Sequence, residues 1–123
     1  MATTAYVIPH DKDKPITPLV LDGDYIDEIV LAVFGQESGP LGWSTLRGAD
    51  IQFFYDDVGL YLQPENINHR AMKLWAHAAG RSLDDFRQPL VGNYVVLGVN
   101  RIGDMTDVPS SIESKLTEEW MSL

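Results

Sequence analysis

The sequence contains no cysteine, and this absence removes several classes of site together. Disulfides, thiolate zinc sites, iron–sulfur clusters and cysteine nucleophiles are all excluded. Long hydrophobic runs are missing too. No apolar stretch approaches the roughly 20 residues that a membrane-spanning helix needs, so we expect no membrane partner. The first residues carry neither a basic segment nor a long apolar segment of the kind that directs secretion, and we expect a cytoplasmic protein.

Basic residues are scarce. Nine Lys and Arg face eighteen Asp and Glu, which gives a formal charge of −9 and a pI near 4.5. Such a chain repels phosphate, so we expect no direct contact with nucleic acid. The charge is also uneven along the chain. Residues 15–46 hold five acids and no base, whereas bases outnumber acids in residues 68–87.

Motifs for catalysis or cofactor binding are absent as well. The sequence has no nucleotide-binding glycine motif and no G-x-S-x-G nucleophile elbow. His69 and His77 would lie about 12 Å apart along a helix, too far to share one metal ion. Asp56 and Asp57 are typical turn residues. We expect no catalytic residue, metal or cofactor, although a pair of carboxylates brought together by the fold remains open.

The best-signalled element is a helix over residues 66–80. Its apolar residues recur at i, i+3, i+4 and i+7 and form one stripe, which consists of Ala71, Leu74, Trp75 and Ala78. Asn66 is placed to cap the start of the helix, and Gly80 suits the left-handed residue that closes it. β-prone segments flank this helix on both sides, so we expect its stripe to pack on a sheet.

The remaining pattern predicts one α+β domain over residues 1–123, with about five strands in a mixed or antiparallel sheet and three helices packed on it. The predicted strands are residues 5–8, 19–21, a hairpin of 51–55 and 60–62 around an acidic turn, and a central, doubly covered strand at 90–99. A first helix over 25–34 has the expected buried stripe Ile26, Ile29, Val30 and Val33, and Asp24 lies at its start. Residues 36–48 are rich in glycine and predict a loop.

A last helix is predicted from the capping box at Ser110. Its stripe consists of Ile112, Leu116, Trp120 and Leu123. Because no later chain covers this stripe, it must pack on the domain's own sheet or on a second copy. We favour the first arrangement and therefore a monomer, with a symmetric homodimer as the alternative.

Short motifs in the same order along nearly the whole chain resemble one known family. They are Tyr6-Val7-Ile8-Pro9, Leu21-Asp22-Gly23-Asp24-Tyr25-Ile26, Tyr55-Asp56-Asp57-Val58-Gly59, Asn68-His69-Arg70-Ala71, residues 91–98, and Asp107-Val108-Pro109-Ser110 with the helix to Trp120. The chain resembles small proteins of unknown function from actinobacterial phages and conjugative elements. The resemblance implies an accessory protein of mixed α and β structure in an infected bacterial host, and it implies no activity.

Two functional hypotheses follow. The leading one is a non-enzymatic module that binds a host macromolecule, in one version an acidic inhibitor that imitates DNA. The candidate partner-binding residues are Asp22, Asp27, Glu28, Glu37 and Trp43. Trp43 either folds back onto the core or stands exposed as an anchor.

The alternative hypothesis is a protein that binds or sequesters a small ligand or nucleotide. Its motivation is the locally basic segment, which offers fork-like donors beside Trp75. The candidate ligand-binding residues are Asn68, His69, Arg70, Lys73 and Arg81.

Overall fold

The computed structural model describes residues 2–22, 25–35 and 39–122, and its centre is strand β5 (Tyr94–Val99). All six residues of β5 are buried, as the near-continuous apolar run predicted. The strand begins at Tyr94 rather than at residue 90, because Val91 forms only an isolated bridge with Ile67 and Gly92 adopts a φ of +84°. The residues before Tyr94 therefore leave the sheet.

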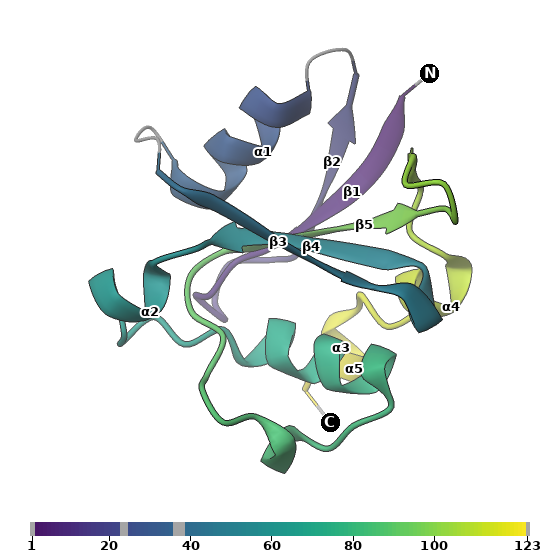
Figure 1. Ribbon diagram of the computed structural model, residues 1–123. Coiled ribbons are helices and arrows are strands. Elements are labelled where there is room, and N and C mark those ends of the chain that lie inside the picture. The colour runs from purple at the N-terminus through teal and green to yellow at the C-terminus, as the bar shows by residue number, and fades with distance from the viewer. Residues whose placement is uncertain (1, 23–24, 36–38, 123) are drawn as a thin grey trace.

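The sheet formed by the described residues has six strands, and every pairing in it is antiparallel (Figure 1). The strand order is β2-β1-β5-β4-β3, and β6 also pairs with β5. This confirms the predicted α+β class. The other strands are β1 (Thr3–Ile8), β2 (Thr17–Leu21), β3 (Leu41–Leu46), β4 (Ile51–Asp56) and β6 (Met105–Thr106).

Helices cover both faces of the sheet, which gives three layers (Figure 1). On one side, the α1 face, lies α1 (Tyr25–Phe34). On the other, the α3 face, lie α3 (His69–Ala79), α4 (Ser110–Glu113) and α5 (Glu118–Met121). The short α2 (Gly59–Leu62) stands where β4 ends, and the 3-10 turns are η1 (Arg47–Ala49) and η2 (Leu83–Asp85). None of the described helices is long and apolar enough to cross a membrane.

Side chains that alternate along the strands divide the core into two clusters. The cluster on the α1 face consists of Ala5, Leu21, Ile29, Val33, Phe54, Val95 and Leu97. The cluster on the α3 face consists of Ile8, Ile51, Phe53, Ala71, Leu74, Tyr94, Val96, Val108 and Ile112. The sheet therefore positions neighbouring residues of one strand in two separate environments.

The predicted stripes of α1 and α3 are largely confirmed. Ile29 and Val33 of α1 are buried and Val30 is half-buried, but Ile26, in the first turn of the helix, is exposed. The predicted cap Asp24 lies outside the described residues. In α3 the predicted stripe packs on the sheet, and Gly80 closes the helix with a φ of +66°. The predicted cap Asn66 is wrong, since Asn68 accepts the capping hydrogen bond from the Ala71 N–H.

The predicted hairpin over residues 51–62 is wrong. β4 pairs with β3 and β5, and the residues after Asp56 turn away from the sheet and form α2. The Asp56 carboxylate accepts a hydrogen bond from the Val58 N–H, which fixes this turn. The predicted loop over 36–48 is wrong for its second half, which forms β3. Gly42 is needed within that strand, because a Cβ there would lie 2.7 Å from the Tyr55 ring.

The single C-terminal helix is also a wrong prediction, because two short helices, α4 and α5, replace it. Pro109 rather than Ser110 is the N-cap of α4, and it makes no side-chain capping bond. The expected packing within the chain is nevertheless seen: Ile112 is buried, and Leu116 and Trp120 pack against the core of the α3 face. Leu123, the last residue of the predicted stripe, lies outside the described residues.

Candidate functional site

A pocket of about 230 Å³ opens where β4 ends, beside α2 and the segment that leads into β5. We call it the Tyr–Asp pocket, because three tyrosines and two aspartates line it. Figure 1 shows this end of the sheet, where β4 passes into α2. The lining residues are Tyr55, Asp56, Asp57, Leu60, Tyr61, Gln88, Pro89, Val91 and Tyr94. None of them is basic.

The carboxylate of Asp56 is held firmly in this pocket. Asp56 is only 9% exposed. Its Oδ1 accepts a hydrogen bond of 3.1 Å from the Val58 N–H, and its Oδ2 accepts one of 3.1 Å from Nε2 of Gln63. Asn66 in turn donates to the Gln63 side-chain oxygen. These neutral donors fix the carboxylate in place without neutralising its charge.

Tyr94 lines the same pocket from the central strand. It is 4% exposed, and its ring stacks on Tyr55 at 5.1 Å and meets Phe53 edge-on. Its hydroxyl makes no hydrogen bond to a described residue. Among described side chains, only Glu28 Oε2 and Arg70 Nε are both sealed from solvent and unpaired. The unpaired Tyr94 hydroxyl must therefore reach solvent, which it does at the pocket.

The pocket is electronegative. Burial raises the pKa of Tyr94 above its ordinary value, and the neighbouring Tyr55 and Asp56 raise this pKa further. The hydroxyl thus stays protonated and neutral, with a free lone pair. Carboxylate and hydroxyl oxygens beside aromatic rings suit an organic cation, such as an ammonium or guanidinium group. A divalent metal fits less well, because it needs more oxygen ligands. In the described part of the chain, no three His, Cys, Asp or Glu side chains are grouped to hold a metal ion.

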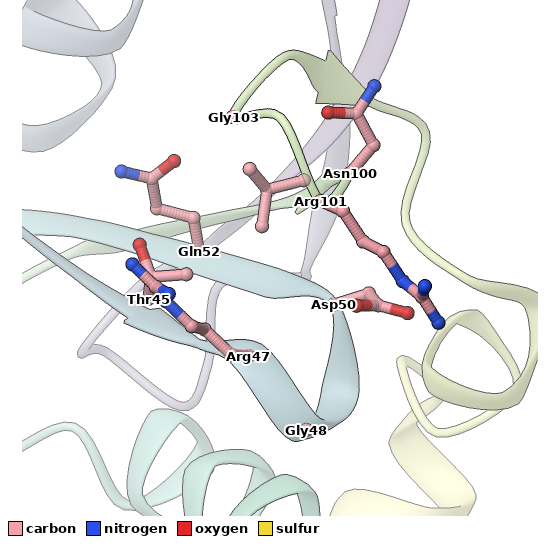
Figure 2. Close-up of a pocket in the computed structure, with 9 residues that line it drawn as sticks. Thr45, Arg47, Gly48, Asp50, Gln52, Asn100, Arg101 and Gly103 are labelled. Atoms are coloured by element: carbon pink, nitrogen blue, oxygen red, sulfur yellow. The ribbon is translucent and has the colours of Figure 1, made fainter.

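A second, wider cleft of about 630 Å³ lies on the α1 face, at the end of the β3–β4 pair where η1 connects the two strands (Figure 2). Figure 2 shows Arg47 lying beside Thr45, whereas Arg101 extends on the other side next to Asp50. The two guanidinium groups point apart, so they do not converge on one small anion. The lining is Thr45, Arg47, Gly48, Asp50, Gln52, Val99, Asn100, Arg101 and Gly103. The Tyr–Asp pocket is therefore the better-built site.

Asn68, Arg70 and Lys73, which the sequence marked as ligand-binding candidates, make bonds within the chain. Asn68 is fully buried, and its Nδ2 donates to the carbonyls of Ile8 and Gly92 at 2.8 and 2.9 Å. Arg70 donates to the carbonyls of Pro9 and Asp11.

Lys73 donates to the Trp120 carbonyl and lies 4.7 Å from the centroid of that ring. His69 is exposed, and Arg81 lies at a separate small pocket beside Trp75. His69, Arg70 and Lys73 line one pocket of about 300 Å³, together with Met72, Leu83 and Met121. The structure thus brings three of the five candidates together, whereas Asn68 and Arg81 do not line this pocket.

The acidic candidates differ in exposure. Asp22 and Asp27 are exposed, on β2's end and on α1. Glu28 is half-buried, and its Oε2 is sealed from solvent without a partner among the described residues. Glu37 lies outside the described residues.

Trp43 does not fold back onto the core. It is 64% exposed on β3, an edge strand of the sheet. Of the two readings of Trp43, packing onto the core is therefore wrong, and the exposed position is the one that the structure shows. The register explains the exposure, because Trp43 lies opposite Phe54 on the α1 face, beside the outermost edge.

Sequence reasoning did not find the Tyr–Asp pocket. Asp56 and Asp57 were interpreted as turn residues, and Tyr94 as part of a fully covered strand. One signal was present: a tyrosine in an otherwise aliphatic and glycine-containing run brings a polar hydroxyl that needs a partner. The run itself did not show that α2 and Gln88 would leave this hydroxyl beside a carboxylate.

The chain matches no protein-family model, no curated protein and no solved structure. The site must therefore be interpreted from its own chemistry.

Proposed function

We propose that this protein is a non-enzymatic binding module that receives a basic side chain of a partner protein in the Tyr–Asp pocket. The observation that carries the proposal is the hydroxyl of the otherwise buried Tyr94, which makes no hydrogen bond to a described residue and belongs to the same pocket lining as Asp56. A lysine ammonium or arginine guanidinium would donate to both groups. The rings of Tyr55 and Tyr61 would cover the apolar part of that side chain.

The charge of the whole chain supports the same kind of partner. A formal charge of −9 attracts a basic protein and speeds its encounter with the pocket. The pocket then supplies the selective contacts. From the resemblance to phage and conjugative-element proteins, we propose that the partner belongs to the cytoplasm of a bacterial host.

An inhibitor that imitates DNA is a more specific version of this function. The exposed Asp22 and Asp27 support it, but the inward-facing Glu28 does not. The small-ligand alternative at α3 has less support, because Arg70 and Lys73 make hydrogen bonds to carbonyls of the chain. A basic segment of a host protein is therefore the partner that we propose.

The test is a fluorescence-anisotropy titration at low salt with a labelled peptide of alternating lysine and glycine. The double variant Asp56→Asn with Asp57→Asn is compared with the double variant Asp13→Asn with Asp104→Asn. Asp13 and Asp104 are exposed and lie outside the pocket, so both variants change the net charge equally. We expect the pocket variant to bind about tenfold more weakly, since a charged hydrogen bond contributes roughly 1.5–3 kcal/mol.

Equal weakening by both variants would mean that the peptide responds only to net charge, and the pocket would not be the site. Equal binding of a glutamate–glycine peptide would reject the basic partner. Circular dichroism of each variant verifies that the fold is retained, because Asp56 also holds the turn into α2.

A further inference from the structure

We propose that the partner segment binds in extended form and adds a strand to the open edge of β3. Its residues would alternate, with apolar side chains beside Trp43 and basic side chains beside Tyr55 and Asp57. This inference rests on the proposed function for the basic chemistry of the partner. The extended conformation of the segment is inferred from the backbone groups of β3.

The hydrogen-bond pattern shows which groups of β3 face outward. The Asp57 N–H donates to the Pro40 carbonyl at 2.9 Å, which makes this a hydrogen-bonded pair of the β3–β4 ladder. Such pairs alternate in an antiparallel ladder, so Gly42, Ser44 and Leu46 direct their backbone groups toward β4. Leu41, Trp43 and Thr45 therefore direct theirs away from the sheet. These three residues therefore offer their backbone N–H groups, in register, to a new strand at the outer edge of β3.

The opposite edge strand, β2, is protected against the addition of a further strand. The Thr4 N–H donates to Asp107, away from β2, so Thr4 and Val20 form a non-hydrogen-bonded pair of the β1–β2 ladder. Pairs of one kind recur every two residues, so Tyr6 and Pro18 form a non-hydrogen-bonded pair too. The nitrogen of Pro18 thus faces the outer edge, where it has no hydrogen to donate. Proline at this position is a usual protection against unwanted strand pairing. β3 contains neither proline nor lysine, and so lacks this protection.

The two faces of β3 offer different chemistry to a neighbouring strand. On the α1 face, Trp43 is 64% exposed and offers an apolar contact. On the α3 face, Gly42 has no side chain, and the Tyr55 ring and the Asp57 carboxylate occupy the space where one would project, at 2.7 and 2.9 Å from the ideal Cβ position. Tyr55 and Asp57 also line the Tyr–Asp pocket.

An added strand places its side chains alternately on the two faces. Residues on the α1 face would lie next to Trp43 and gain from being apolar. Residues on the α3 face would lie next to Asp57 and gain from being basic. The segment would be a β-prone run in which lysine or arginine alternates with aliphatic residues, a form of recognition by strand addition.

The experiment uses the full chain and a labelled seven-residue peptide of alternating lysine and valine. The Thr45→Pro variant removes one outward N–H and leaves the β3–β4 ladder in place, while Thr45→Ala removes the side chain and keeps that N–H. We expect Thr45→Pro to weaken binding about tenfold, as for the loss of one good hydrogen bond, and Thr45→Ala to change it less than twofold. Circular dichroism shows whether Thr45→Pro remains folded.

A second measurement works from the peptide side and needs no protein variant. In an added strand, alternate residues direct their N–H groups toward β3. N-methylation of that set of residues should abolish binding, whereas N-methylation of the other alternate set should leave binding unchanged. A block-ordered peptide with four lysines followed by three valines should bind more weakly than the alternating one.

Insensitivity to Thr45→Pro and to N-methylation of either set would overturn strand addition. If the lysine–glycine peptide still depended on Asp56 and Asp57, the proposed function would stand alone. Light scattering tests whether a second copy of this chain pairs with the edge of β3. A wild-type dimer that Thr45→Pro converts into a folded monomer would show such pairing and would also overturn the proposal.

Discussion

Replacement of Tyr94 by phenylalanine separates a binding role from a structural one. The substitution keeps the ring that stacks on Tyr55 and packs on Phe53, and it removes only the hydroxyl. That hydroxyl has no hydrogen-bond partner among the described residues, so the fold loses no bond. A structural tyrosine would behave differently, because its buried partner would be left unsatisfied.

The expected change in stability follows from burial. A buried polar group without a partner costs about 1–3 kcal/mol, and the hydroxyl of Tyr94 recovers part of that cost because it reaches solvent. We therefore expect the free energy of unfolding of Tyr94→Phe to be unchanged or higher by up to about 1 kcal/mol. In a domain of this size, this corresponds to an increase in Tm of up to roughly 5 °C.

The pH dependence gives an independent measurement. Burial raises the pKa of Tyr94 in the folded protein, whereas the unfolded tyrosine ionises near its ordinary value of about 10. Above that pH the unfolded state loses its proton first, so the folded state loses stability by about 1.4 kcal/mol per pH unit. Tyr6 also has a raised pKa, mainly through burial and its hydrogen bond to Glu113, but it is present in both proteins. Their difference therefore reports Tyr94.

Urea unfolding at pH 7 and at pH 11, together with the lysine–glycine peptide titration, completes the test. Tyr94→Phe should bind the peptide several-fold more weakly, remain at least as stable at pH 7, and lose less stability at pH 11 than the wild type. A fall in stability of more than about 1 kcal/mol at pH 7 would refute the reasoning, because it would show that the hydroxyl has a partner in the fold.

Three further predictions concern the scaffold. Asn68→Ala should reduce the free energy of unfolding by roughly 3–5 kcal/mol, because it removes the α3 cap and the buried hydrogen bonds to the Ile8 and Gly92 carbonyls. Asn66→Ala should cost less than about 1 kcal/mol, and urea titration compares the two variants. Gly98→Ala should cost about 3 kcal/mol or more, because the added Cβ would overlap the Asp107 carbonyl oxygen. Gly48→Ala, with open space around it, should be nearly neutral in a thermal melt. Trp120→Ala should cost about 2–3 kcal/mol, since the half-buried ring packs on His77 and Lys73, and light scattering should show an unchanged monomer mass; a dimer that the variant dissociates without loss of Tm would instead identify an interface.

The sequence by itself determined the elements with strong local signals. The period of Ala71, Leu74, Trp75 and Ala78 marks α3 because burial on one face needs that spacing whatever the fold around it. The long β-branched run likewise marks β5 as central. Residues 82–85 form a capping box at the start of η2, and the local sequence suffices for it because its hydrogen bonds join residues only two and three positions apart.

The pairing of strands was decided only by the tertiary structure. A strand's partner depends on which distant segment completes its hydrogen bonds, so residues 41–46, with two small polar residues and a glycine, gave no local sign of β3. The same holds for Asp56, whose neighbours equally suit a hairpin turn and the entry to α2. The predicted last helix is two short helices, α4 and α5, and both pack against the core of the α3 face. The spacing of the apolar residues from Ile112 to Trp120 does not show this break.

The candidate site belongs almost wholly to the tertiary structure. Composition determined that the chain is acidic, and this charge is one ground for the basic partner that we propose. Folding decided which acids line the candidate site, because it sealed the Oε2 atom of Glu28 from solvent and set Asp56 beside Tyr94, 38 positions further along the chain. Asn68 and Arg70 show the converse, since both resemble ligand donors in the sequence and both donate to backbone carbonyls in the fold. Local patterns fix the elements because their interactions are local, and the pocket depends on contacts that form only when distant segments meet.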